Sequence, residues 1–226
     1  MQPGIRLSLI LLFSFAVFPA PALSAADKLK FLSEAHFEFS IELFRQVARA
    51  KPGNLVISAQ NVNVGLALLF LGSTANTTSS YQLRRTLHYE NMSYVDIHRS
   101  HKRAQEVLAE NYYTTNHQFY SKTGLFVQKG AGVKEDYGRA VREFYRSEIT
   151  PVDFGASGSG QVVDTVNQWA AKVTGGAVEQ LLSAGPGSDS RLLLASAASI
   201  VPGWLHPFDP LATRYNGLFF LPGGRR

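Results

Sequence analysis

The sequence predicts an α+β fold, in which helical segments come first and strands are mixed with helices later in the chain. Apolar residues recur at helical spacings through most of the chain before Phe119. Longer strand-like segments occur only afterwards, at Phe119–Gln128 and Leu192–Val201. A parallel α/β protein would alternate strands and helices throughout, so this order favours α+β.

The first predicted helix covers Ala26–Ala50, because apolar side chains recur there three and four residues apart. The face that we expect this helix to bury consists of Phe37, Ile41, Phe44 and Ala48. Burial of this stripe would attach the helix to the rest of the domain.

A short buried strand is predicted at Leu55–Ile57, followed by a second helix over Ser58–Leu71. That helix is apolar on nearly all sides, which places it in the core. Gly72 ends it, because glycine tolerates the left-handed backbone that often follows a helix. Thr77 or Thr78 is expected to cap a third helix.

The other predicted elements continue to the end of the domain. They are helices over Asp96–Asn111 and Val133–Arg146, a helix ending at Val173, a short element at Ala177–Leu182, and strands over Phe119–Gln128 and Leu192–Val201. The glycine-rich and serine-rich segment Gly155–Gly160 is expected to be a flexible connection.

Residues 1–25 are predicted to be a secretory signal peptide, with the mature domain at 26–226. The apolar run Leu7–Phe18 follows a positive charge and precedes small residues, and cleavage is expected between Ala22 and Ala26. An uncleaved signal anchor is the alternative. The run is shorter than the roughly 20 residues that span a bilayer, and no later segment is predicted to do so.

Composition excludes several kinds of function. The chain has no cysteine, so its stability must come from a core instead of disulfides, and thiolate zinc sites and cysteine nucleophiles are excluded. The net charge is +5, and Arg6, Arg225 and Arg226 supply part of it. Because no dense basic stripe is present, nucleic acid is not an expected partner, whereas an anionic polysaccharide remains one.

Two asparagines begin acceptor sequences for N-glycosylation. Asn76 is followed by Thr77 and Thr78, and Asn91 is followed by Met92 and Ser93. Both are predicted glycosylation sites in a secreted protein.

A series of motifs runs in order along the mature chain. They are Asn54–Ser58, Ala67–Thr77, Val152–Phe154, Val166–Trp169, Thr174–Val178, Trp204, Pro207–Pro210 and Thr213. Together they resemble the serpins, a family of serine protease inhibitors. The resemblance covers the mature chain but only the first half of a complete serpin.

The resemblance implies a serpin-like fold, in which N-terminal helices pack on a partial central sheet, called sheet A, and the C-terminal half of the fold is missing. The residues that it implies as scaffold are Ser58, Asn167, Trp169, Thr174, Ser196, Trp204 and Phe208. Trp204 is expected to anchor the top of the sheet by its large buried area. Asn167 and Thr174 are expected to satisfy backbone groups near helix ends.

The chain departs from the family pattern where, by the resemblance, sheet A opens. Ala59 replaces a proline, Asn61 replaces a serine, and Ser196 replaces an asparagine. The segment Ser199–Pro202 replaces an aromatic and Lys-Gly pattern.

Serpins inhibit proteases with a bait loop that inserts into sheet A after cleavage, and the resemblance implies a serine protease as partner. The reactive-centre loop would lie beyond Arg226, so we expect this chain to be non-inhibitory as it stands. Sheet A would end at Leu192–Val201 with an unpaired apolar edge. Marginal stability or assembly with another chain is the expected consequence.

Two other functions were weighed against inhibition. Binding of a heparin-like polysaccharide is the alternative, because Arg99, Lys102 and Arg103 share one helical face and the resemblance places them on a helix that binds such chains in some serpins. Catalysis is not expected: Gly155–Ser159 misses the Gly-x-Ser-x-Gly pattern, and the histidine pair in His98–His101 lacks acidic ligands. No catalytic, cofactor or metal residue is therefore assigned.

Overall fold

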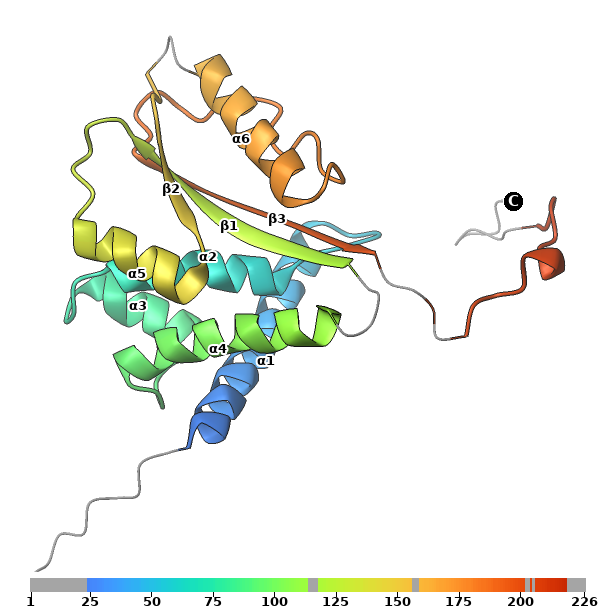
Figure 1. The fold of residues 1–226 in the computed structure, drawn as a ribbon, viewed down its shortest axis with the longest axis horizontal. Coiled ribbons are helices and arrows are strands. Elements are labelled where there is room, and N and C mark those ends of the chain that lie inside the picture. Colours follow the sequence, from blue (N-terminus) through green and yellow to red (C-terminus); the bar gives the residue numbers. More distant parts are fainter. Residues whose placement is uncertain (1–23, 114–117, 156–158, 202–203, 205, 219–226) are drawn as a thin grey trace, which may run out of the picture.

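A computed structural model describes residues 24–113, 118–155, 159–201, 204 and 206–218. The predicted signal peptide lies almost entirely outside these residues. Helices precede the first strand, and later strands alternate with helices, which confirms the α+β prediction (Figure 1).

Helix α1 spans Ala25–Ala50 and begins with a reciprocal cap. The Ser24 hydroxyl accepts from the Asp27 backbone N–H, while the Asp27 carboxylate accepts from the Ser24 N–H. The Ser24 hydroxyl and the Ser24 N–H both donate to the Asp27 carboxylate, which lowers the pKa of the Asp27 carboxyl. The position of the helix agrees with the prediction.

The predicted buried face of α1 is wrong. The residues that it buries are Leu32, Ala35 and Phe39, whereas Phe37 and Phe44 are 67% and 48% exposed. The two stripes lie on different sides of one helix. Helical spacing identifies an apolar stripe, but the neighbouring elements decide which stripe is covered.

Three more helices complete the layer around α1. Helix α2 spans Ala59–Gly72, α3 spans Thr78–Thr86, and α4 spans Tyr94–Tyr113. The Thr77 hydroxyl caps α3 by accepting from the Ser80 N–H, one of the two caps predicted. Helix α2 buries Ala67, Leu68 and Phe70, as expected for a core helix.

The predicted strand at Leu55–Ile57 is wrong. These residues form no regular element, and Val56 is 98% exposed. A strand needs a hydrogen-bonding neighbour, and none of the described strands pairs with this segment.

The sheet has three strands in the order β2-β1-β3. Strand β1 spans Gln118–Gln128, β2 spans Glu148–Val152, and β3 spans Leu192–Val201. Strand β2 runs parallel to β1, and β3 runs antiparallel to it, with Thr123 opposite Ser196. Strand β2 was not predicted from the sequence; it is a short edge strand that contains Pro151.

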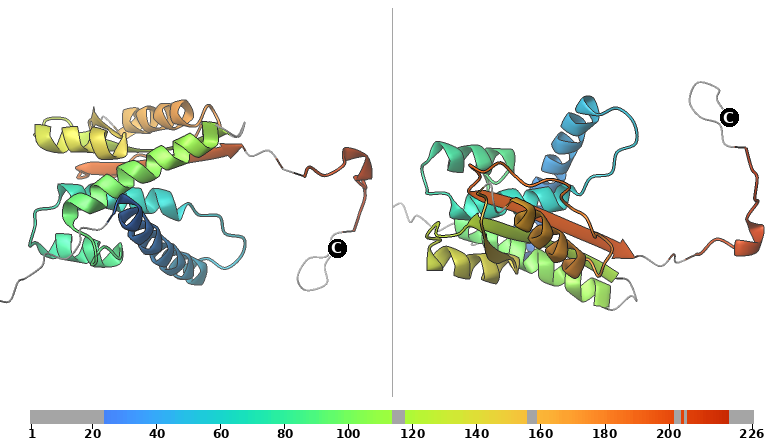
Figure 2. Two further views of the ribbon diagram at one scale, coloured as in Figure 1. Left: turned by 60° about the horizontal axis from the view of Figure 1, so that its bottom comes forward. Right: turned by 90° about the horizontal axis from the view of Figure 1, so that it is seen from above.

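Helices cover both faces of this sheet. Helix α6 (Ser159–Val173) lies on one face, α2 lies on the other, and α5 (Glu135–Tyr145) packs beside β2 (Figures 1 and 2). Because side chains alternate along β1, Leu125 belongs to the core of the α1–α5 layer and Phe126 to the core under α6.

The remaining segments contain little regular structure. Residues 174–191 form turns and bends, so the short element predicted at Ala177–Leu182 is not a helix or a strand. After β3, the described residues extend away from the body of the molecule and include the 3-10 turn η1, Pro210–Ala212 (Figure 1).

Candidate functional site

A buried polar junction joins α2 to the sheet. Asn61, in the first turn of α2, accepts through its Oδ1 from the Ser121 hydroxyl at 2.8 Å. The Ser196 hydroxyl donates to the Asn61 carbonyl at 3.4 Å and lies 2.8 Å from the Thr123 hydroxyl. Asn61 and Thr123 are 7% and 4% exposed, so these hydrogen bonds replace water.

Asn61 and Ser196 were predicted from the family resemblance, whereas Ser121 and Thr123 were not. The two missed residues stand two apart on β1, and therefore on the same face of the strand. That pattern was a usable signal, because two hydroxyls on the inner face of a strand need partners from a facing helix or strand.

Ser58 precedes α2 at its N-cap position. Its carbonyl accepts from the N–H groups of Asn61 and Val62, but its hydroxyl makes no capping hydrogen bond. Ala59 follows it as the first helical residue. The Ser58 side chain lines a cleft instead.

The cleft lies between α2 and β3 and has a volume of about 590 Å³. Its lining is mainly apolar, with Val62, Leu66 and Leu194 on its walls and Ser58, Asn61 and Ser196 as polar groups. Strand β3 pairs with β1 on one side and with no other described strand. An edge strand beside an apolar cleft can add an extended segment through its free backbone groups.

Helix α6 is fixed to the sheet by an aromatic contact over a glycine. The Trp169 ring packs edge-on against Phe126 with ring centroids 5.7 Å apart. A Cβ atom at Gly124 would lie 3.0 Å from the Trp169 ring. A larger residue at position 124 would therefore crowd the Trp169 ring, which would have to move by a few tenths of an ångström.

Asn167 and Thr174 tie the end of α6 to the segment that follows it. Asn167 accepts from the N–H groups of Leu181 and Leu182 at 2.8 Å and donates to the Leu182 carbonyl at 2.9 Å. Thr174 is buried; its hydroxyl donates to the Ala170 carbonyl and accepts from the Val178 N–H. Because Val178 and Leu181 line the cleft, both side chains shape its wall.

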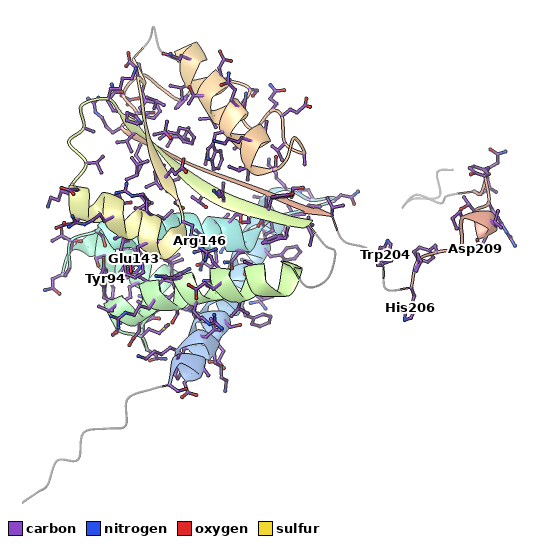
Figure 3. All side chains as sticks on the ribbon, in the orientation of Figure 1. Tyr94, Glu143, Arg146, Trp204, His206 and Asp209 are labelled. Carbon is purple, nitrogen blue, oxygen red and sulfur yellow. The ribbon has the colours of Figure 1, made fainter. Side chains whose placement is uncertain are left out.

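Trp204 does not anchor the sheet, which corrects the prediction. It is 74% exposed, and Phe208 is 83% exposed. The centroids of the two rings lie 6.1 Å apart. Both residues belong to the segment beyond β3, in which Figure 3 labels Trp204. A tryptophan is buried only where other elements enclose it, and no described element does so here.

The basic segment of α4 is divided between the core and the surface. His98 and His101 are each 1% exposed and point inward, while Arg99 and Arg103 are exposed. Lys102 pairs with Glu143 of α5 at 3.7 Å, and Arg103 pairs with Glu106 at 3.4 Å. Acidic partners therefore reduce the positive charge of the predicted polysaccharide face.

Both predicted glycosylation asparagines are exposed. Asn76 lies in the turn before α3 with a φ of 64°, a left-handed conformation that asparagine adopts more readily than most residues. Asn91 lies in the connection before α4.

Two further observations concern metals and membranes. In the part of the chain that the structure describes, no three His, Cys, Asp or Glu side chains are grouped as a metal site would require. No helix of that part combines the length and the apolar character needed to cross a bilayer.

Comparison with known proteins identifies the family. Residues 34–225 match the family described as Serpin (serine protease inhibitor). The chain belongs to the serpin family, whose members are generally protease inhibitors and not enzymes.

Curated relatives show how much of a serpin is present. A leukocyte elastase inhibitor of Sus scrofa is 28% identical over 186 residues, which are 81% of this chain and 47% of that protein. Serpin B3 of Homo sapiens is 26% identical over 81% of the chain and 50% of its own length. Corticosteroid-binding globulin of Oryctolagus cuniculus is 24% identical over 89% of this chain and 51% of its own length. The chain spans about half the length of the curated relatives it matches.

Solved structures support the fold independently. The mouse protein-Z dependent protease inhibitor superimposes with a TM-score of 0.73 at 21% identity, over 84% of this chain and 50% of that one. Emu ovalbumin superimposes with a TM-score of 0.69 at 21% identity, over 81% of this chain and 50% of the ovalbumin chain. The three-stranded sheet and its helices are thus a partial serpin fold.

Proposed function

We propose that this chain provides the N-terminal framework of a secreted serine protease inhibitor, and that these 226 residues alone do not inhibit. The observation that carries the proposal is the unpaired edge of β3 beside the cleft against α2. This edge can accept an additional strand, as trapping by loop insertion requires.

The same edge explains why the chain alone is expected to be inactive. Insertion traps a protease only if the loop enters between two strands and changes the energy of the whole sheet. No described strand stands on the far side of β3, so a segment added there would extend the sheet without opening it. A bound protease would then cleave the chain and leave.

A serine protease is the proposed partner class, because the relatives include a leukocyte elastase inhibitor and the structural neighbours include a protein-Z dependent protease inhibitor. The test incubates the full chain with trypsin-like, chymotrypsin-like and elastase-like serine proteases. Denaturing gels should show cleavage products only. Porcine leukocyte elastase inhibitor is the positive control, and an SDS-resistant complex with the 226-residue chain would contradict the proposal.

Secretion and glycosylation are tested in cultured animal cells. The chain should appear in the medium with a new N-terminus at residues 23–26, and glycosidase treatment should lower its mass. Thr78→Ala removes the first acceptor sequence while keeping Asn76 and the Thr77 cap. Asn91→Gln removes the second and keeps Ser93, whose hydroxyl accepts from the Asp96 N–H. Retention in the cells would oppose secretion, and an unchanged mass would oppose glycosylation.

Polysaccharide binding is a second candidate, favoured by the outward position of Arg99 and Arg103 on α4. Because such binding releases counterions, it weakens with salt. The triple variant Arg99→Ala, Lys102→Ala, Arg103→Ala should elute from heparin at lower salt than the parent. Arg139→Ala, on α5 and paired with Glu135, is the matched control. Equal elution of parent and triple variant would exclude this face.

A further inference from the structure

Three histidines from two helices meet in the core of the helical layer. His36 of α1 and His101 of α4 have ring centroids 5.1 Å apart. His98 stands one turn before His101, and both are 1% exposed. The Nε2 atom of His36 is also buried. We refer to His36, His98 and His101 as the histidine cluster.

The hydrogen bonds of the cluster suit neutral rings. The Tyr89 hydroxyl donates to Asn63 Oδ1 at 3.0 Å, so its oxygen is left to accept from His101 Nε2 at 2.7 Å. His98 Nδ1 lies 2.6 Å from the Tyr145 hydroxyl. In each pair a single proton lies between a ring nitrogen and a phenol oxygen. A neutral imidazole is sufficient to form that hydrogen bond.

A second proton on His98 has no acceptor among the described residues. His36 Nε2 and His98 Nε2 are buried and make no hydrogen bond to any described residue. An imidazolium donates from both nitrogens. Protonation of His98 would therefore bury a charged N–H group without a partner, which is costly in a low-dielectric core. At His36 burial outweighs the hydrogen bonds of Gln60 and Asn63, which favour the protonated ring.

The described groups that pack against the cluster supply no compensating negative charge. Each packed element contributes groups to the cluster: Gln60 and Asn63 from α2, Tyr89 from the connection before α4, Tyr94 from α4, and Phe144 and Tyr145 from α5. The titratable groups among these are tyrosines, and burial raises the pKa of each one. The nearby carboxylates of Asp96 and Glu143 pair with lysines.

Burial accordingly lowers the pKa of His36 and of His98 to about 4. Burial and the two neighbouring histidines lower the pKa of His101 well below its ordinary value. An unfolded histidine takes up its proton near pH 6.5. The unfolded chain therefore binds more protons than the folded one below that pH. The stability that the neutral rings contribute to the folded chain is fully present above about pH 6.5 and is lost as the pH falls towards about 4.

We propose that the histidine cluster is an acid-sensitive latch, which holds α1 against α4 at neutral pH and releases these helices in mildly acidic solution. The layer of α6 on the sheet has a separate core around Phe126 and Val166, with no histidine among its described members. It therefore stays packed when the helical layer opens. The proposal does not depend on the proposed inhibitory role.

The test measures urea unfolding of the full chain by far-UV circular dichroism between pH 7.5 and 5.0, above the range in which ordinary carboxyl groups titrate. Each cluster histidine should raise the unfolding equilibrium constant up to about tenfold per pH unit below pH 6.5, and three should raise it up to about a thousandfold. In the variant His98→Asn, which keeps a polar atom near Tyr145, the increase of the unfolding equilibrium constant per pH unit should be up to about tenfold smaller than in the parent.

The control is His206→Gln, because His206 is exposed in the segment beyond β3 (Figure 3). It should show the parent's pH dependence. A pH-independent urea midpoint in the parent would overturn the proposal, and so would an equal change in slope for His98→Asn and His206→Gln. If His98→Asn does not fold, NMR titration of the parent decides: three histidine rings should stay neutral for as long as the helical circular dichroism is intact, and their titration near pH 6.5 in the folded chain would overturn the proposal.

Selective release is measured separately with Trp169 fluorescence, in a Trp204→Phe background that leaves one tryptophan. On acidification, helical circular dichroism should fall before Trp169, packed on Phe126, becomes exposed. Coincident changes in the two signals would show global unfolding and overturn the latch.

Discussion

The two sides of helix α1 carry similar apolar side chains but lie in different surroundings. On one side, Phe39 is 5% exposed and packs in the core of the helical layer. On the other, Phe37 is 67% exposed and Phe44 is 48% exposed. The contrast shows that sequence periodicity gives the apolar faces of a helix, whereas the packing partners determine which of them is buried.

The sheet repeats this contrast. Strand β1 is paired on both sides, and its Leu125 and Phe126 are each 1% exposed. Strand β3 is paired with β1 alone among the described strands, and Ile200 and Val201 near its end are 54% and 57% exposed. The exposed side of α1 and the exposed end of β3 are therefore the surfaces that further segments would need to cover in the proposed framework.

Truncating one phenylalanine on each side gives the largest expected difference. Phe39→Ala empties a site that is 5% exposed and should lower the free energy of unfolding by about 3–5 kcal/mol. Phe37→Ala should cost less than about 1 kcal/mol, because most of its ring already contacts water. Urea unfolding at pH 7.5 measures both. Equal losses would mean that the Phe37 side is covered in solution, and sedimentation would then reveal self-association.

The α6 side of the sheet should tolerate no added bulk beneath Trp169. Gly124→Ala places a Cβ atom 3.0 Å from the Trp169 ring and 3.1 Å from Phe126, which should cost about 1–3 kcal/mol in unfolding free energy. Gly160→Ala is the matched control, because nothing lies within 4 Å of its added Cβ atom and alanine favours a helix. A neutral Gly124→Ala variant would show that α6 can shift away from the sheet.

Sequence reasoning located most elements because their signals are local. The boundaries of β3 and the Thr77 cap of α3 follow from apolar runs and capping residues in the segments themselves. The errors at Leu55–Ile57 and Trp204 have a different origin. Aliphatic residues and tryptophan both favour burial, but whether they are buried depends on elements from elsewhere in the chain. Strand β2 was missed because a five-residue edge strand containing proline carries a weak pattern.

The candidate site was predictable to a smaller extent. The family resemblance pointed to Asn61, Asn167 and Ser196, but not to their partners. Ser121, which donates to Asn61, is distant from it in the sequence. Asn167 bonds to the backbone of Leu182, so the leucine side chain gives no signal of the contact. The inward turn of His98 and His101 could not be foreseen from a segment rich in cations. It follows from helical geometry, which places their rings towards α1 and α5 while Arg99 points to solvent.

The wall of the cleft should depend on Asn167. Asn167→Ala removes three hydrogen bonds to the backbone of Leu181 and Leu182 and should cost about 1–3 kcal/mol of unfolding free energy. Asn167→Asp keeps an acceptor for the two N–H groups and loses the donor to the Leu182 carbonyl, so a smaller loss is expected. Hydrogen exchange should accelerate at residues 181–182 in Asn167→Ala and much less in Asn167→Asp. If Asn167→Ala is as stable as the parent, this segment is held by other contacts.

The smallest effect is expected at the surface pair that joins α4 to α5. Lys102 and Glu143 are partly solvent-exposed and 3.7 Å apart (Figure 3 labels Glu143), so Lys102→Met should change the unfolding free energy by less than about 0.5 kcal/mol. Glu143→Gln should be equally mild, yet it frees the Lys102 charge and should strengthen retention on heparin. Urea unfolding and heparin elution of this variant therefore separate two properties of one face. A loss of several kcal/mol from Lys102→Met would show that α4 and α5 are held together by this pair, and not by the buried contacts of His98 with Tyr145.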